Sequence, residues 1–237
     1  MGQRQRTEGI TFRGFFKSDL VNYPGYVAST VFPCGCNFRC PYCHNPEFVV
    51  IGSDETYFGE TYTEEEILEH LNRRKGFLDA LVVSGGEPTL HADLAAFLRR
   101  IKGIGLKVKL DTNGSRPEVL RSLIGEGLLD YVAMDLKAPL EKYRLLGFNS
   151  PDLIEESMKL LKETEIDHEF RTTCPKVFLE ESDFPEMAKL VGTSKWYLQT
   201  FNPSKTLDPA YNNVSSFSKE ELSAIITSLG LKNVRVR

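Results

Sequence analysis

Four of the five cysteines in this 237-residue chain lie close together, at positions 34, 36, 40 and 43. The last three have the spacing Cys-x3-Cys-x2-Cys, with Tyr42 directly before the final cysteine. Three thiolates on one short loop can bind three corners of a four-iron four-sulfur cubane. The fourth iron can then take the amino and carboxylate groups of a small molecule, as a catalytic metal keeps an open position for its substrate. The spacing therefore predicts a 4Fe–4S cluster on Cys36, Cys40 and Cys43.

A zinc ion is the alternative ligand for these cysteines. Together with Cys34 they would supply four thiolates, which satisfy tetrahedral zinc, and the chain would then be a zinc-stabilised binding module without catalysis. The fifth cysteine, Cys174, stands alone at the end of a predicted strand, so we expect it to be a small buried hydrophobic residue.

Three further polar segments follow predicted strands: Gly85-Gly86-Glu87, Asp111-Thr112-Asn113-Gly114 and Asp135-Leu136-Lys137. The carboxyl ends of parallel barrel strands meet at one face, so we expect all three segments beside the cysteine loop. A glycine pair lets the backbone approach a ligand closely, and carbonyls with a carboxylate offer acceptors to an ammonium group.

The elements that must position these segments alternate along the chain. Thr63 with Glu66, and Ser218 with Glu221, form capping boxes that start two helices. Glycine stops and apolar runs define the others. We expect strands at 27–32, 80–83, 107–110, 131–134, 169–173 and 196–201, and helices from 63, 94–101, from 117, 154–161, 184–190 and 218–229.

Repeated strand-helix units imply right-handed crossovers and a parallel sheet. About six units fit where a complete eight-unit barrel typically needs about 250 residues. We therefore predict an α/β fold, an incomplete and laterally open (β/α)6 partial TIM barrel, in a single domain over residues 1–237. The cluster loop would cover about 33–62, and a C-terminal helix and tail about 202–237.

Composition excludes several classes of protein. Charged residues make up 26% of the chain and the net charge is -4, which is not the basic excess of a nucleic-acid binder. Residues 1–8 are polar, and no stretch is long and apolar enough to span a bilayer. Clustered cysteines in a chain without an export signal favour metal ligation over disulfides. We expect a cytoplasmic protein that binds neither nucleic acid nor membrane.

With Cys-His-Asn-Pro at 43–46, the cysteine motif resembles the radical S-adenosylmethionine (radical SAM) superfamily, and most of all its glycyl-radical-enzyme activases. These include the pyruvate formate-lyase activating enzyme and the activating protein of anaerobic (class III) ribonucleotide reductase. The similarity extends from about Val27 to Phe201. It implies an oxidoreductase that cleaves SAM with one electron from the cluster, so that a 5'-deoxyadenosyl radical abstracts hydrogen from a substrate. A flavodoxin- or ferredoxin-like protein would donate the electron.

The resemblance also implies roles for the segments beside the cysteines. Gly85, Gly86 and Glu87 would hold the methionine ammonium of SAM, and Lys137 would face its carboxylate or ribose, with Arg171 as a second positive group. A sodium or potassium ion would bind Asp111, Thr112, Asp135 and the carbonyl of Met134. The remaining cofactor contacts would come from Tyr42, whose ring would lie against the adenine, from Cys43 and His44, and from Asn113. Alternatively, these are solvated strand-end residues, and Tyr42 only packs the loop.

In the resembled families three cysteines bind the cluster, so Cys34 is left without a ligand role. The resembled enzyme also carries an adenine-contacting histidine at the last strand, where this chain has Gln199, Phe201 and Asn202. We expect no catalytic side chain, because cluster and SAM carry the radical chemistry. The expected substrate is a glycine of a partner enzyme, anaerobic ribonucleotide reductase. A glycyl radical enzyme of the pyruvate formate-lyase type, or a small molecule, is the alternative.

Overall fold

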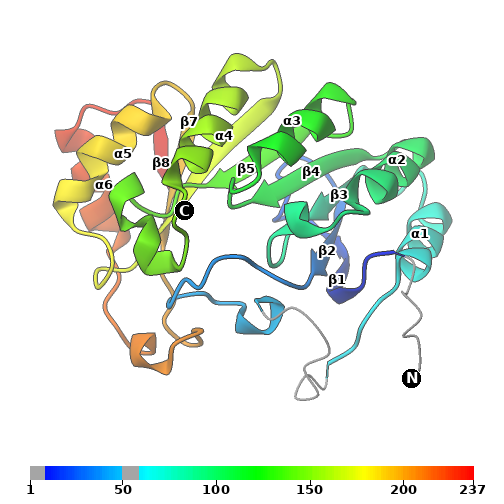
Figure 1. The fold of residues 1–237 in the computed structure, drawn as a ribbon, viewed down its shortest axis with the longest axis horizontal. Coiled ribbons are helices and arrows are strands. Elements are labelled where there is room, and N and C mark those ends of the chain that lie inside the picture. The colour runs from blue at the N-terminus through cyan, green and yellow to red at the C-terminus, as the bar shows by residue number, and fades with distance from the viewer. Residues whose placement is uncertain (1–8, 50–58) are drawn as a thin grey trace.

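A computed structural model describes residues 9–49 and 59–237 of the chain (Figure 1). The polar segment 1–8 and residues 50–58 of the predicted cluster loop lie outside the described residues. The remainder of that loop, including all four of its cysteines, is described.

An eight-stranded sheet forms the frame, with its strands neighbouring one another in chain order. The first strand pairs antiparallel with the second, and every later pair is parallel. In the described residues the two edge strands do not pair with each other, which confirms the predicted open α/β barrel. The strands are β1 (Phe12–Asp19), β2 (Ala28–Pro33), β3 (Ala80–Val83), β4 (Lys107–Thr112), β5 (Tyr131–Asp135), β6 (Asp167–Cys174), β7 (Lys195–Thr200) and β8 (Val234–Val236).

The six predicted strands correspond to β2–β7. The edge strands β1 and β8 extend the sheet beyond the prediction, since β1 joins β2 without an intervening helix and β8 has only three residues.

Helices fill the crossovers and lie on the outer side of the curved sheet (Figure 1). They are α1 (Glu64–Arg73), α2 (Leu94–Ile104), α3 (Pro117–Gly125), α4 (Pro151–Glu163), α5 (Phe184–Val191) and α6 (Lys219–Ser228). Short 3-10 helices are η1 (Pro46–Phe48), η2 (Pro88–Leu90), η3 (Leu140–Leu146), η4 (Glu181–Asp183) and η5 (Pro209–Tyr211).

The predicted capping boxes start α1 and α6. The hydroxyl of Thr63 accepts from the backbone N–H of Glu66 at 3.3 Å, and the carboxylate of Glu66 accepts from the N–H of Thr63 at 2.7 Å. Ser218 and Glu221 make the same reciprocal pair at 3.2 and 2.8 Å. Each pair satisfies two backbone donors that a helix start leaves without partners.

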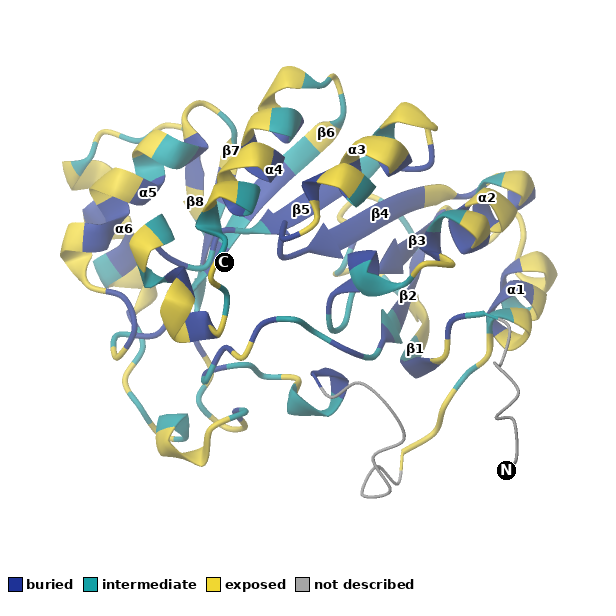
Figure 2. Cartoon of the chain, viewed as in Figure 1, coloured by how far each residue is buried: buried dark blue, intermediate teal, exposed yellow. Residues whose placement is uncertain are grey.

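The two faces of the sheet differ in polarity because successive side chains on a strand alternate between faces. The outer face packs against the helices in one large apolar core, to which Leu81, Val108, Leu110 and Val132 belong (Figure 2). On the inner face, a small apolar cluster of Tyr23, Ala28, Ala80 and Val82 fills one end. Nearer the carboxyl ends of the strands, the inner face carries the charged residues Lys109, Asp111, Asp135, Glu169 and Arg171. The inner face is therefore polar near the carboxyl ends of the strands.

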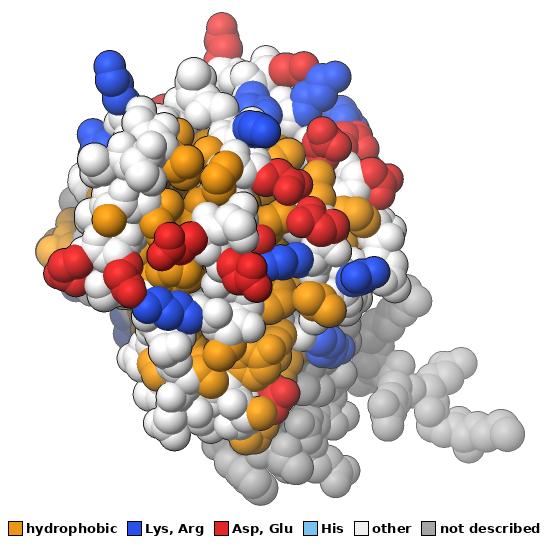
Figure 3. Space-filling view, turned by 90° about the vertical axis from the view of Figure 1, so that its left-hand side faces the viewer, with side chains coloured by type: hydrophobic (Ala, Val, Ile, Leu, Met, Phe, Trp, Pro, Cys, Tyr) orange, Lys and Arg blue, Asp and Glu red, His pale blue; other side chains and the backbone are white. Residues whose placement is uncertain are grey.

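On one side of the molecule, charges of both signs lie close together (Figure 3). Figure 3 views the side formed by α5 and α6, where acidic and basic side chains are interspersed with apolar ones. Within residues 9–49 and 59–237, no helix has the length and apolar character needed to cross a membrane.

Candidate functional site

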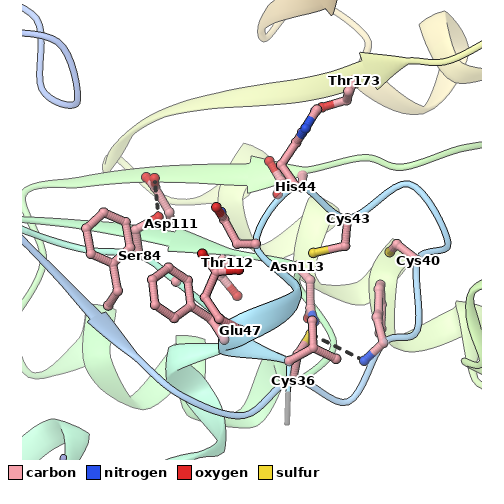
Figure 4. Close-up of a pocket in the computed structure, with 18 of the residues that line it drawn as sticks. Cys36, Cys40, Cys43, His44, Glu47, Ser84, Asp111, Thr112, Asn113 and Thr173 are labelled. Carbon is pink, nitrogen blue, oxygen red and sulfur yellow. Dashed lines mark hydrogen bonds between the residues drawn. The ribbon is translucent and has the colours of Figure 1, made fainter. Parts of the chain in front are cut away.

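A cavity of about 820 Å³ opens at the carboxyl ends of the strands. The loop after β2 forms one wall of this cavity, and Figure 4 shows Cys36, Cys40 and Cys43 on that loop, facing Asp111 and Thr112 from β4. Backbone hydrogen bonds fix the loop. The N–H of Arg39 donates to the carbonyl of Leu146 at 2.7 Å, and the N–H of Cys36 donates to the carbonyl of Val49 at 3.1 Å.

The other two cysteines lie elsewhere. Of the described residues that line the cavity, three are cysteines, and Cys34 is not one of them. The carbonyl of Cys34 instead lies 2.9 Å from Nε2 of His91. Cys174 ends β6 and is fully buried, as predicted, and its thiol contacts the carbonyl of Thr172.

Burial makes the three cavity thiols weaker acids than a free cysteine. It raises the pKa of Cys36 to about 11 and that of Cys40 to about 12, and it also raises the pKa of Cys43. The nearby ammonium of Lys137 opposes this rise at all three thiols. Among the described residues, no group of three His, Cys, Asp or Glu side chains is arranged to hold a single metal ion.

The predicted glycine pair lines the cavity next to Ser84. Gly85 has a φ of +101°, and a Cβ at Gly86 would lie 2.2 Å from the carbonyl oxygen of Gly35. The pair therefore allows the end of β3 to approach the backbone of the cysteine loop, a contact that a side chain would prevent.

Glu87 is completely buried and is not among the described cavity residues. Its carboxylate accepts hydrogen bonds from the N–H of Asn113 at 2.6 Å, from the hydroxyl of Thr112 at 2.8 Å and from the N–H of Thr89 at 3.1 Å. It therefore ties the segment after β3 to the segment after β4. Asn113 does line the cavity, and its amide donates to Oδ1 of Asn37 at 3.0 Å.

Charged residues from three strands meet across the cavity. Arg171 on β6 contacts Asp111 at 3.1 Å and Asp135 at 3.0 Å, and Lys137 contacts Asp135 at 2.8 Å. Burial alone would raise both carboxyl pKa values. Arg171 and Lys109 outweigh burial at Asp111 and lower its pKa, and Lys137 and Arg171 outweigh it at Asp135 and hold its pKa at about 2. Asp135 in turn raises the pKa of Lys137 against the effect of burial. All four side chains stay charged at neutral pH.

Aromatic residues close the cysteine side of the cavity. The ring of Tyr42 packs 5.1 Å from that of Phe178 and 6.2 Å from that of Phe201, and His44 lies 5.0 Å from Phe201. In the part of the chain that the structure describes, the buried hydroxyl of Tyr42 has no hydrogen-bond partner. Tyr42, His44 and Gln199 all line the cavity.

The cavity thus brings together nearly all of the predicted site residues. Two predicted residues, Glu87 and Met134, are absent from the described lining. Met134 is buried, and its side chain packs against Gly114. The sequence prediction missed two groups. One is a row of rings, Phe16, Phe32 and Phe48, with centroids 5.1 and 5.2 Å apart. The other is Lys109, which is buried behind Asp111; a lysine between Val108 and Leu110 in an apolar strand was its signal.

Comparisons with known proteins agree with this geometry. The model of the radical SAM superfamily matches residues 30–191. A protein of Methanocaldococcus jannaschii, named as a glycyl-radical enzyme activating enzyme, is 32% identical over 234 residues, which covers 94% of each chain. The pyruvate formate-lyase-activating enzyme of Clostridium pasteurianum is 33% identical over 127 residues, 50% of this chain and 48% of that enzyme.

Solved structures share the fold at lower sequence identity. The crystal structure of QueE from Escherichia coli aligns with a TM-score of 0.61 at 15% identity, and the alignment covers 96% of this chain and 92% of that one. A domain of the pyruvate-formate lyase-activating enzyme from Bacteroides vulgatus aligns at 0.54 and 18% identity, over 67% of this chain and 99% of that domain. With more than half of its length matched by the family model, and a relative similar over nearly its whole length, the chain belongs to the radical SAM superfamily.

Proposed function

We propose that the chain activates a glycyl radical enzyme, and that its partner is anaerobic ribonucleotide reductase. One observation carries this proposal: Cys36, Cys40 and Cys43 share a cavity with Asp135, Lys137 and Arg171, whereas Cys34 lies outside its described lining. The reaction is an oxidoreduction in which SAM is cleaved and a hydrogen atom leaves a glycine of the partner.

Membership of the radical SAM superfamily implies a 4Fe–4S cluster and SAM. The residues fit both groups. Three cysteine sulfurs are soft ligands of the kind that iron-sulfur clusters use, and they face one space. The buried hydroxyl of Tyr42 has no hydrogen-bond partner among the described residues, so it can accept one from a bound group. When bound, the cluster supplies one electron that cleaves SAM into methionine and a 5'-deoxyadenosyl radical, which abstracts hydrogen.

In this proposal, the side chains of the protein bind SAM and orient it. Lys137 and Arg171 are held as cations by Asp135, so they can attract the carboxylate of SAM. The backbone at Gly85 and Gly86 faces the cavity and offers carbonyls to the methionine ammonium. Glu87 contributes indirectly, because its carboxylate holds Thr112 and Asn113 by hydrogen bonds.

A further part of the cavity lining supports a polypeptide substrate. There Phe16, Phe32 and Phe48 form an apolar row, and Arg13 and Asn22 add polar groups on the β1–β2 hairpin. The sheet is open at β1, and an open sheet can admit a loop that a closed barrel would exclude. An extended segment around a glycine suits such a surface because it has little side-chain bulk.

Two of the relatives support the same class of substrate. The protein similar over 94% of its length is named for glycyl radical enzymes, and a second relative is named for pyruvate formate-lyase. The choice of the reductase, and of a flavodoxin- or ferredoxin-like electron donor, is part of the proposal.

Electron paramagnetic resonance tests the proposal. The reconstituted protein is mixed anaerobically with the reductase, SAM and reductant. We expect a glycine-centred doublet on the reductase, with methionine and 5'-deoxyadenosine formed alongside it. A reductase variant with alanine at the radical glycine should give no doublet.

Other outcomes separate the alternatives. A doublet with pyruvate formate-lyase but not with the reductase would change the partner and keep the enzyme class. Conversion of a small molecule without any partner protein would refute the activase proposal.

A further inference from the structure

Every carboxylate oxygen of the two aspartates at this cavity is already bound by a protein cation. Oδ1 of Asp111 accepts from the ammonium of Lys109 at 2.5 Å, and its Oδ2 accepts from Arg171 at 3.1 Å. Oδ1 of Asp135 accepts from Arg171 at 3.0 Å, and its Oδ2 accepts from Lys137 at 2.8 Å. The four oxygens are therefore used within the protein.

The other two predicted ligands of a sodium or potassium ion are no more available. The hydroxyl of Thr112 donates to Glu87 at 2.8 Å and accepts from the N–H of Gly114 at 3.1 Å. Met134, whose carbonyl was the predicted ligand, is not among the described residues that line the cavity. The residues present do not fit the cation that the resemblance implied.

Lys109 supplies Asp111 with a cation from within the protein. Its side chain is 3% exposed and lies on the inner face of β4, two residues before Asp111 and hence on the same side of the strand. A buried ammonium is costly unless it is paired, and Asp111 is its partner. Lys109 is not one of the described cavity residues, so SAM would meet Asp111 and not the lysine.

The local charge also leaves no need for an ion. Three cations, Lys109, Lys137 and Arg171, surround the two aspartates. A further positive ion would be repelled by them, and this repulsion is strong where burial lowers the effective dielectric constant.

We infer that Lys109 is a positioning residue that serves as the permanent cation of the SAM site, so that this protein binds SAM without sodium or potassium. Lys109 holds Asp111, Asp111 and Asp135 hold Arg171, and Arg171 with Lys137 faces the cofactor. This inference concerns the cofactor side of the cavity and does not depend on the glycyl partner proposed above.

The wild-type protein gives the first test. Its melting temperature and its SAM dissociation constant are measured in sodium, potassium and tetramethylammonium chloride at one ionic strength, because tetramethylammonium is too large for a carboxylate site. We expect the same values in all three salts. A dissociation constant at least fivefold lower in sodium or potassium, or a higher melting temperature there, would overturn the inference.

Variants at Lys109 give the second test. Lys109→Ala removes the ammonium and leaves a space behind Asp111, so in tetramethylammonium chloride SAM affinity should fall about tenfold, the value of one charge-assisted hydrogen bond. Sodium, potassium or methylammonium should restore most of it and raise the melting temperature. Lys109→Met fills the space without a charge, so it should lose affinity and not be restored.

Lys107→Ala is the matched control, since Lys107 lies on the same face of β4 but is exposed. It should behave as the wild type does. If Lys109→Ala binds SAM within twofold of the wild type in tetramethylammonium chloride, Lys109 does not position the site. If that variant does not fold, the wild-type salt comparison alone decides.

Discussion

Arg171 joins Asp111 on β4 to Asp135 on β5 through two different nitrogens of one guanidinium group. Its terminal nitrogen lies 3.1 Å from Asp111, and its Nε lies 3.0 Å from Asp135. A planar group with several fixed donors can hold two carboxylates in one geometry, which a lysine could not do. The ends of these two strands at the cavity are therefore fixed relative to each other.

The first prediction concerns acid stability and this pairing. The pKa of Asp135 is about 2 in the folded protein, against an ordinary value of 3.8, because its cations outweigh burial. A carboxyl whose folded pKa is depressed stabilises the fold fully above its unfolded pKa and loses that contribution as the pH falls through the folded value. The contribution of Asp135 should therefore disappear between about pH 4 and pH 2.

Urea unfolding of Asp135→Asn measures this contribution. At pH 7 the variant should be less stable by on the order of 2 kcal/mol, the linkage value of such a shift. The difference from the wild type should shrink as the pH approaches 2. Equal stability of the two proteins at pH 7 would show that the ion pairs do not stabilise the fold.

The second prediction concerns the cysteines. Cys36→Ala, Cys40→Ala and Cys43→Ala should each lose the cluster and all formation of 5'-deoxyadenosine, because three ligands hold three irons. Cys34→Ala and Cys174→Ala should keep most of both, since neither cysteine is among the described cavity residues. Iron and sulfide content after anaerobic reconstitution measures the outcome. A cluster that is lost in Cys34→Ala would favour four thiolate ligands instead.

Much of the fold could be predicted because strands β2–β7 each carry a local signal. Apolar runs such as 80–83 end at glycines, and the capping box at Thr63 marks a helix start. The edge strand β1 carries no such signal. It contains Gly14, it is half exposed and it joins β2 without a helix, so only its pairing with β2 makes it a strand.

The site, like the fold, has some residues with a local signal in the sequence and others without one. The three predicted cluster ligands carry a local signal because they lie within eight residues of the sequence, from 36 to 43. Lys109 stands out in the sequence only as a lysine between two apolar residues. Its environment could not be predicted, because it depends on burial and on Arg171, which lies 62 residues later and reaches the same carboxylate. The row of Phe16, Phe32 and Phe48 likewise comes from β1, β2 and η1, which only the folded chain brings together.

The third prediction tests the close approach at the glycine pair. In Gly86→Ala the new Cβ would lie 2.2 Å from the carbonyl oxygen of Gly35 and 2.7 Å from that of Phe48, and neither backbone can rotate away. We expect a loss of about 3 kcal/mol in unfolding free energy and a displaced cysteine loop. The fluorescence of Trp196, the single tryptophan of the chain and a buried one, reports unfolding.

Gly103→Ala is the control for this prediction. Gly103 lies within α2, and a Cβ there would meet nothing within 4 Å. Alanine should stabilise the helix by about 0.5–1 kcal/mol. If both variants lost stability equally, the effect at Gly86 would not come from the contact with the cysteine loop.

The last prediction compares two buried tyrosines that line or adjoin the cysteine loop. Tyr42 and Tyr143 are both almost completely buried, but their hydroxyls differ. The hydroxyl of Tyr143 accepts a hydrogen bond from the N–H of Lys137 at 3.1 Å, whereas that of Tyr42 has no partner among the described residues. A buried hydroxyl without a partner costs free energy, while a paired one contributes about 1 kcal/mol. In the cluster-free protein, Tyr42→Phe should therefore raise the free energy of unfolding by about 1 kcal/mol, and Tyr143→Phe should lower it by a similar amount. Urea unfolding of the two variants beside the wild type measures both changes in the free energy of unfolding.

SAM affinity of the reconstituted Tyr42→Phe protein then tests the adenine contact. A ring that stacks on adenine keeps its affinity without the hydroxyl, so a tenfold loss would mean that the hydroxyl itself binds the cofactor. Destabilisation of the cluster-free protein by Tyr42→Phe would instead show that the hydroxyl is paired within the protein.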